Sequence, residues 1–200
     1  MLAISHTKMT GGSFRLARDQ ERKFQESYAK LTKKCPETLT WVERVTQPLF
    51  HMFFDIDIKR ELSSQEIIDI AHSIVRITAP DEKWLLSSPG AVPGKTGIHL
   101  NAQFVVDKEK ARSFARTVID SGILTEDELD TKPFNNGGFR MLWSKKANGS
   151  PPYVPIEEYC DGVWKKVDNE TCDREYYIKK YSVRYIATQS MTDSVSTTLD

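Results

Sequence analysis

Two aspartates stand two positions apart in one of the most apolar stretches of the sequence. Asp55 and Asp57 interrupt residues 49–58, which are otherwise rich in aromatic and β-branched side chains and predict a strand buried on both faces. Residues two apart on a strand share one face. Because two unpaired buried carboxylates are costly, we expect a divalent cation such as Mg²⁺ beside them, bound together with substrate phosphates. The alternative is a frayed strand end that Lys59 and Arg60 neutralise.

A second group of candidate residues begins at Lys95. Lys95, Gly97 and His99 fall on one face of a predicted strand, and the opposite face is apolar. A lysine and a histidine presented together can bind phosphate oxygens, although a lone histidine is more often a structural residue. The Gly-Lys-Thr triplet that ends at Thr96 is not a P-loop, because Pro89 stands where the first glycine of that motif belongs.

A third group follows Asp130. A hairpin-type turn at 135–138 leads into a predicted strand at 139–144, which carries Arg140, and Lys146 comes shortly after it. An acid followed by two cations that point outward would supply one metal ligand and two phosphate contacts. The alternative is a charged surface hairpin.

The elements that must position these residues alternate along the chain. Predicted strands lie at 49–58, 83–87, 97–106 and 139–144, followed by a strand-like segment from Tyr153. Predicted helices lie at 18–33, after the capping box at 63–66, at 108–121 and at 172–186, with a brief helical turn at 126–129. Strands that interleave with helices and hairpins predict an α+β fold.

Composition restricts the class of protein. The 200 residues are 39% hydrophobic and carry no net charge, which is ordinary for a globular domain and neither suggests nor excludes nucleic acid binding. Three cysteines without a CxxC pair fit a reducing, intracellular compartment, and structural thiols are favoured over a zinc site. No apolar run approaches the roughly 20 residues of a membrane span.

In their order, the three groups resemble the archaeo-eukaryotic primase superfamily. Asp-x-Asp on a hydrophobic strand precedes a histidine on a later strand, and then an Asp followed by Phe-Arg-x-x-x-Ser-Lys. The match spans about residues 50–146 and is most similar to the primase–polymerase branch and to primases of large DNA viruses. The resemblance implies the catalytic fold of that superfamily, with mixed or antiparallel sheets and an RRM-like core flanked by helices.

The resemblance also implies roles for individual residues. Asp55, Asp57 and Asp130 would be the catalytic residues and would bind Mg²⁺ or Mn²⁺. The residues that bind the triphosphate of the incoming nucleotide would be Lys95, His99, Arg140 and Lys146, with Lys145 as a near alternative. One departure concerns Gly97, because the family pattern usually has serine two positions before the histidine. Possible template contacts are Arg15, Trp143, Lys145, Lys165 and Lys166.

The implied activity is that of a DNA primase or primase–polymerase that joins NTPs or dNTPs on a single-stranded DNA template. We expect one catalytic domain over 1–200, divided into an N-terminal segment (1–45), a catalytic core (46–146) and a C-terminal strand and helix (147–200). The resemblance further implies a longer protein with a helicase domain or replisome proteins as partners, and no membrane. It places the protein at a replication site in the cytoplasm or nucleus, for example in a virus-infected cell.

Three alternatives compete with this interpretation. A PD-(D/E)xK nuclease would use Asp57 and Lys59, but it would need a separate upstream acid and leaves His99 and Arg140 unexplained. A DxD sugar transferase should begin with a nucleotide-binding βαβ unit, which the sequence does not show. A catalytically inactive nucleic-acid-binding module would not need three metal-binding acids.

Overall fold

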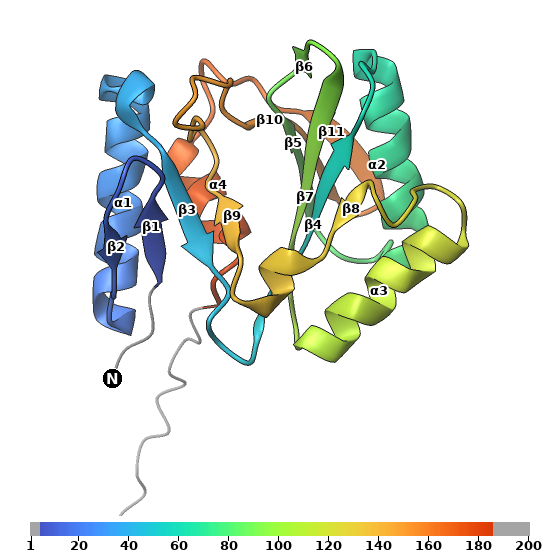
Figure 1. Ribbon diagram of the computed structural model, residues 1–200, viewed down its shortest axis with the longest axis horizontal. Helices are drawn as coiled ribbons and strands as arrows, with labels where there is room; N and C mark the ends of the chain where they lie inside the picture. The colour runs from blue at the N-terminus through green and yellow to red at the C-terminus, as the bar shows by residue number, and fades with distance from the viewer. Residues whose placement is uncertain (1–4, 186–200) are drawn as a thin grey trace, which may run out of the picture.

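Two antiparallel sheets form the framework of the computed structural model, which describes residues 5–185 (Figure 1). The larger sheet contains, in spatial order, β11 (Val163–Lys166), β10 (Val154–Cys160), β5 (Trp84–Ser88), β7 (Lys95–Val106), β4 (Phe50–Ile58) and β8 (Leu129–Asp130), and β6 (Ala91–Val92) pairs with β7. The smaller sheet contains β2 (Ser13–Phe14), β1 (His6–Lys8), β3 (Trp41–Arg44) and β9 (Gly138–Arg140). The α-helices are α1 (Arg18–Lys34), α2 (Ser64–Thr78), α3 (Lys108–Asp120) and α4 (Arg174–Tyr181), and 3₁₀ turns lie at Pro36–Thr38 and Lys132–Asn135.

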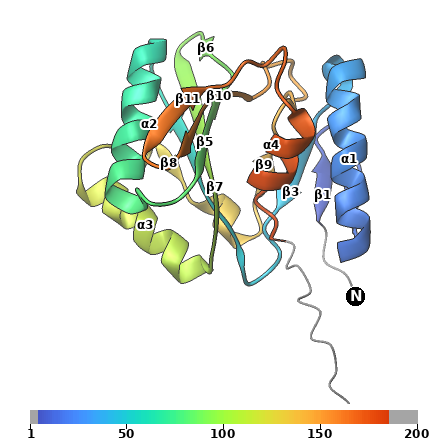
Figure 2. The same cartoon turned by 180° about the vertical axis from the view of Figure 1, so that it is seen from behind.

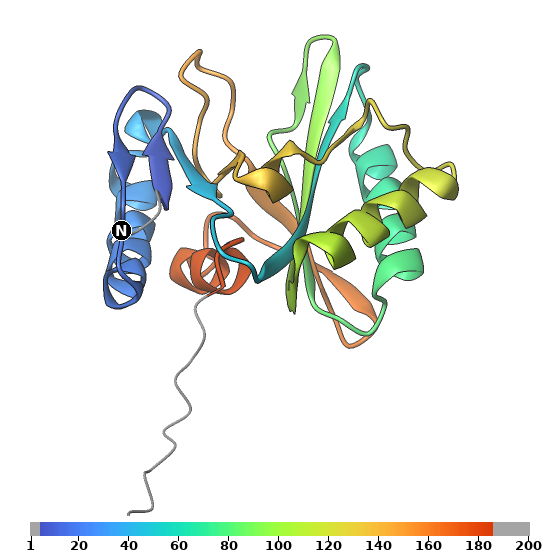
Figure 3. The same cartoon turned by 60° about the horizontal axis from the view of Figure 1, so that its bottom comes forward.

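The centre of the larger sheet has the expected RRM-like topology. Along the chain the elements run β4-α2-β5-β7-α3-β8, and in space the strands lie in the order β8-β4-β7-β5. Helices α2 and α3 contact each other and cover the same face of this sheet (Figure 3). The α+β fold class and the RRM-like core are therefore confirmed.

Alternation along β4 decides which side chains meet the helices. Ile56 and its neighbours Phe54 and Ile58 are at most 2% exposed and pack into the core under α2 and α3. Asp55 and Asp57 consequently point to the opposite face. The start of α2 is defined by the expected capping box, in which the Ser63 N–H donates to Glu66 and the Glu66 N–H donates to the Ser63 hydroxyl.

The opposite face of the larger sheet is covered by α4 and the smaller sheet. Helix α4 packs against α1 and β7 and lies between the two sheets, with α1 on the outside (Figure 2). Tyr28 of α1 is buried there, and its hydroxyl donates to the Leu142 carbonyl at 2.7 Å. A separate apolar cluster forms around these contacts.

The segment that follows α4 contacts both sheets. The Val183 N–H donates to the Glu43 carboxylate of β3 at 2.9 Å, and the Val183 carbonyl accepts from the His51 N–H of β4 at 3.1 Å. The Ser182 hydroxyl donates to Glu43 at 2.7 Å, and the Arg184 guanidinium donates to the Arg44 carbonyl at 2.9 Å. The C-terminal part of the described chain is therefore built into the fold.

Three predictions about secondary structure were wrong in part. The strand predicted at 139–144 ends at Arg140, because Trp143 has a φ of 59° that no strand residue adopts. No hairpin turn forms at 135–138, since β9 pairs with β3 of the smaller sheet. The last helix ends at Tyr181, and residue 186 lies outside the described range. Within 5–185, none of the helices combines the length and apolar character needed to cross a membrane.

Candidate active site

Strand register brings two of the three predicted acids together. In the sheet, Asp55 of β4 lies directly opposite Asp130 of β8 on one side and opposite His99 of β7 on the other. Asp57 lies opposite Gly97, at the same end of the strand pair. Directly opposed residues on neighbouring strands place their side chains on the same face about 5 Å apart. The predicted acids and the predicted histidine therefore share one site.

The donor set suits a divalent cation, but the carboxylates do not form a ready-made cage. Carboxylate oxygens are the ligands that Mg²⁺ and Mn²⁺ prefer, and the Asp55 and Asp57 side chains are 18% and 52% exposed, so an ion can reach them. The Asp130 carboxylate instead accepts the Lys132 N–H of its own turn at 2.9 Å. Among residues 5–185, no three acidic, histidine or cysteine side chains stand close enough to hold a metal ion.

Two other acids close to Asp130 are engaged elsewhere. Asp127 lies 3.5 Å from the Lys59 ammonium, and both side chains are largely exposed. Glu128 accepts hydrogen bonds from the N–H and hydroxyl of Thr125 at 2.9 and 3.0 Å. Asp130 is therefore the acid of this segment that faces Asp55. The Lys59 ammonium, which a PD-(D/E)xK site would need beside Asp57, is paired with Asp127.

His99 is held between two aromatic rings. Its ring is 3.4 Å from that of Tyr153 in a nearly parallel stack and 4.1 Å from that of Phe139, both measured between ring centroids. The Nε2 atom lies 3.2 Å from Asp55 Oδ1. Burial lowers the pKa of His99, although Asp55 acts in the opposite direction, so the ring is neutral at pH 7. A neutral histidine that faces Asp55 can orient that carboxylate and donate from Nε2.

Three predicted cations line one pocket beside the acids. Lys95 of β7 lies 3.8 Å from Asp57, whereas Arg140 comes from β9 of the smaller sheet and Lys146 from the loop after it. Burial lowers the pKa of Lys146, and the charges of Arg140 and Lys95 lower it further. Within the described chain neither Arg140 nor Lys146 forms an ion pair with a carboxylate. Cations gathered in this way fit a ligand with several negative charges, such as a triphosphate.

The Arg140 guanidinium is directed by an aromatic ring. Its Cζ atom stands 4.6 Å from the centroid of the Tyr153 ring, and Nη1 donates to the Pro151 carbonyl at 3.4 Å.

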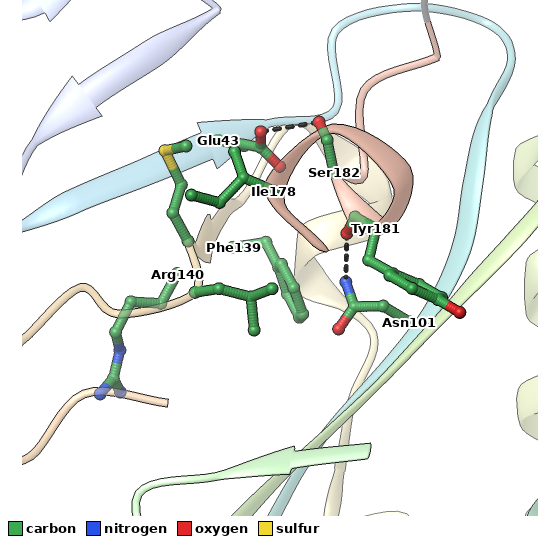
Figure 4. A pocket seen from close by; sticks show the side chains of 9 residues that line it. Glu43, Asn101, Phe139, Arg140, Ile178, Tyr181 and Ser182 are labelled. Carbon is green, nitrogen blue, oxygen red and sulfur yellow. Dashed lines mark hydrogen bonds between the residues drawn. The ribbon is translucent and has the colours of Figure 1, made fainter. Parts of the chain in front are cut away.

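A second, small pocket lies behind Arg140, between α4 and strands β3, β7 and β9 (Figure 4). There Asn101 donates to the Tyr181 carbonyl at 3.0 Å, while the guanidinium points away from it.

The suggested template contacts other than Lys145 lie in different parts of the fold. Trp143 is 3% exposed and lies under the Arg174 guanidinium, so it cannot stack on a base, and that suggestion was wrong. Lys165 and Lys166 lie on β11, at the edge of the larger sheet opposite β8. Arg15 follows β2, at the edge of the smaller sheet opposite β9.

Sequence reasoning missed the two aromatic residues that shape the site. Phe139 precedes Arg140 on β9, and Tyr153 stands one residue before β10. The Phe-Arg pair was noted only as part of a motif. Tyr153 is 54 positions from His99, and no local pattern announces that their rings stack.

Comparison with known families agrees with this geometry. Residues 5–159 match the sequence model of the family described as the C962R protein N-terminal AEP domain, where AEP denotes archaeo-eukaryotic primase. The match covers more than half of the chain and includes β4, β7, β8 and β9, which carry six of the seven predicted site residues. A search of curated proteins returned no match.

Proposed function

The chain belongs to the archaeo-eukaryotic primase superfamily, and from this premise we propose that it is a DNA primase or primase–polymerase. In this proposal it joins NTPs or dNTPs on a single-stranded DNA template. A 3′ hydroxyl attacks the α-phosphorus of the incoming nucleotide, a phosphodiester bond forms, and the bond to the leaving pyrophosphate breaks. The observation that carries the proposal is the register of Asp55, which lies between His99 and Asp130 on its two neighbouring strands.

In the proposed mechanism the acids and the cations have separate tasks. Asp55, Asp57 and Asp130 would hold Mg²⁺ or Mn²⁺, and the bound metal would activate the attacking hydroxyl and stabilise the leaving group. Asp130 can bind the metal once its carboxylate turns away from the Lys132 N–H. The neutral His99 ring has a single N–H, which at Nε2 lies 3.2 Å from Asp55 and keeps this carboxylate in place; it would donate to a phosphate oxygen only when Asp55 binds metal instead.

The cations would bind and orient the triphosphate. Arg140 and Lys146 approach the pocket from the smaller sheet and the following loop, whereas Lys95 approaches from β7. The nucleotide would therefore be held between two sheets, with its α-phosphate directed at the acids. A partly buried cationic pocket stabilises the charge that develops on pyrophosphate more strongly than water does.

The partners follow from the proposed reaction. The substrates would be NTPs or dNTPs and a single-stranded DNA template. We further propose that the domain acts together with a helicase domain or other replisome proteins. Its place would be a site of DNA replication in the cytoplasm or nucleus, including that of a virus-infected cell.

The test is a synthesis assay in which labelled single-stranded DNA, NTPs, dNTPs and Mg²⁺ or Mn²⁺ are incubated with the protein. New product that depends on the template and on metal is expected, and EDTA should abolish it. Asp55→Asn, which keeps the shape of the side chain but removes its charge, should be inactive while it unfolds at the same temperature as wild type.

The same reaction separates the proposed function from its main alternative. A PD-(D/E)xK nuclease would shorten the labelled DNA and would require no nucleotide. Shortened DNA without any new product, or synthesis that Asp55→Asn leaves intact, would overturn the proposal.

A further inference from the structure

Gly97 has no side chain at the position where the family pattern has a serine. The backbone does not demand glycine there, because Gly97 is not among the glycines with positive φ. Glycine is required at this position for a steric reason. A Cβ atom at this position would collide with the Tyr153 hydroxyl and would lie 3.1 Å from its Cζ atom. The phenol end of Tyr153 therefore fills the space that a side chain at 97 would take.

Tyr153 is fixed in this position from several sides. Its ring stacks on His99 at 3.4 Å, the Arg140 guanidinium covers it at 4.6 Å, and only 2% of the residue is exposed. The Tyr153 carbonyl accepts the Trp143 N–H at 2.8 Å, and the next residue begins β10. A side chain held this firmly loses little entropy when a ligand binds.

The hydroxyl of Tyr153 belongs to the cationic pocket. Tyr153 and Gly97 line that pocket together with Lys95, Arg140 and Lys146. Burial raises the pKa of Tyr153 far above its ordinary value, so the phenol keeps its proton and remains a hydrogen-bond donor. Within the described chain no protein group forms a hydrogen bond with this hydroxyl. The hydroxyl is not among the fully buried polar atoms without a partner in residues 5–185, so it opens onto the pocket, where a bound ligand or water can accept its hydrogen bond.

We propose that the Tyr153 hydroxyl donates a hydrogen bond to a phosphate oxygen of the bound nucleoside triphosphate, and so replaces the serine hydroxyl that Gly97 lacks. Tyr153 and Gly97 then form an exchange pair, in which one position supplies the hydroxyl and the other leaves room for it. This inference rests on the proposed function, and it adds a substrate-binding residue that neither the motifs nor the family pattern assigns.

The test compares Tyr153→Phe with wild type in binding of ATP, GTP and dATP in the presence of Mg²⁺ and without template. Phenylalanine keeps the ring stack and removes only the hydroxyl, so triphosphate affinity should fall roughly tenfold or more, as expected for a hydrogen bond to a charged group. Affinity for adenosine, which has no phosphate, should not change. The matched control is Tyr159→Phe, which removes a hydroxyl bound to the Pro80 carbonyl, and it should leave triphosphate affinity unchanged.

A second pair of variants tests the exchange. Tyr153→Leu opens space beside Gly97, so adding Gly97→Ser to it should recover part of the lost triphosphate affinity. In an otherwise wild-type chain, Gly97→Ser should weaken binding, because the new side chain meets Tyr153. Failure of the serine to improve on Tyr153→Leu would overturn the exchange.

The outcomes separate this inference from the proposed function. If the wild-type protein synthesises product but Tyr153→Phe binds triphosphate as tightly as wild type, the role of Tyr153 is wrong and the function stands. If Tyr153→Phe loses stability while the ratio of triphosphate to adenosine affinity is unchanged, the hydroxyl is structural and the inference also fails. If wild type binds no triphosphate at all, both proposals fail.

Discussion

Arg184 and Arg140 are both positively charged, but their surroundings differ in how many acceptors and opposite charges they provide. Arg184 is 7% exposed and lies 3.1 Å from the Glu21 carboxylate, in a buried cluster with His6 and Glu43. The carbonyl of Arg44 and the hydroxyl of Thr46 accept hydrogen bonds from the Arg184 guanidinium. Glu21 has the Arg184 guanidinium beside it and Glu43 accepts two hydrogen bonds, although burial still raises the pKa of Glu21.

Arg140 lies on an aromatic ring and has one long contact to a carbonyl. The neighbouring Lys146 faces two other cations, and Asp57 is half exposed. Partial burial without full compensation is costly for the protein alone. The comparison indicates that the first cluster stabilises the fold, whereas the second keeps charge available for a ligand.

The largest expected effect is on synthesis. Asp57→Ala should reduce template-directed synthesis about 10³-fold or more, since it removes a metal ligand. Its thermal unfolding should match that of wild type, because the Asp57 side chain is 52% exposed and has a single ion pair, at 3.8 Å. Asp69→Ala, on the exposed surface of α2, is the matched control and should stay active. Near-normal activity of Asp57→Ala would remove Asp57 from the centre of the mechanism.

A substitution in the buried cluster should lower the stability of the fold instead of acting directly on synthesis. Glu43→Ala removes the acceptor of the Ser182 hydroxyl and of the Val183 N–H, so we expect a loss of about 3–5 kcal/mol in the free energy of unfolding. Denaturant unfolding measures it. Glu26→Ala removes the exposed partner of Lys179 and should leave the stability nearly unchanged. Equal stability of the two variants would show that the buried cluster does not stabilise the fold.

A smaller effect is expected when a ligand-facing cation is removed. Arg140→Ala should weaken triphosphate binding roughly 10- to 100-fold, because it deletes a charge-assisted contact, while binding of single-stranded DNA persists. His99→Ala should do the same. Titration with nucleotide and, separately, with DNA distinguishes the two affinities. Loss of DNA binding with intact nucleotide binding would mean that these residues serve the template.

The pH dependence of stability should sharpen the comparison further. Burial alone would raise the pKa of Glu43, but His6, the Ser182 hydroxyl and the Val183 N–H together hold it below its ordinary value of 4.5. As the pH falls, Glu43 is therefore protonated at a higher pH in the unfolded chain than in the folded chain. The contribution of Glu43 to the free energy of unfolding is fully present above about pH 4.5 and is lost as the pH falls through the folded-state pKa. Glu43→Gln should lose less stability than wild type between pH 5 and pH 3 in denaturant unfolding. Parallel curves would contradict this assignment.

The smallest expected change is the rotation of one side chain. In a crystal structure with Mn²⁺ and nucleotide, the Asp130 carboxylate should leave the Lys132 N–H and bind an ion that Asp55 or Asp57 also binds. If Asp127 or Glu128 takes that place, the family assignment survives but the assignment of Asp130 does not. Absence of any third acid would contradict the two-metal mechanism.

Local patterns were sufficient for the parts of the site that lie on regular strands. Alternation along β4 predicted the shared face of Asp55 and Asp57, and the ends of the helices at Lys34 and Asp120 lie within one residue of the prediction. The placement of Asp130 depended on Pro133, which prevents a helix from continuing, and on the spacing to Arg140.

The smaller sheet was missed for a physical reason. Strands β1 and β3 are three and four residues long, too short for periodicity to be visible, and β9 joins them from nearly 100 positions away. The positive φ of Trp143 also cannot be read from its residue type. Tyr153 becomes part of the site through another long-range pairing, that of β10 with β5 in the larger sheet.

The short segment after Tyr181 acts as a tether between the two halves of the active site. Its Val183 backbone joins Glu43 on the sheet that carries Arg140 to His51 on the strand that carries Asp55. The match to the family ends at residue 159, before this segment begins. A protease cut between Tyr181 and Ser182 should therefore loosen the position of Arg140 relative to Asp55 without removing either residue. A C-terminal truncation that keeps the site intact should therefore end after Arg184 and not at the end of the family match.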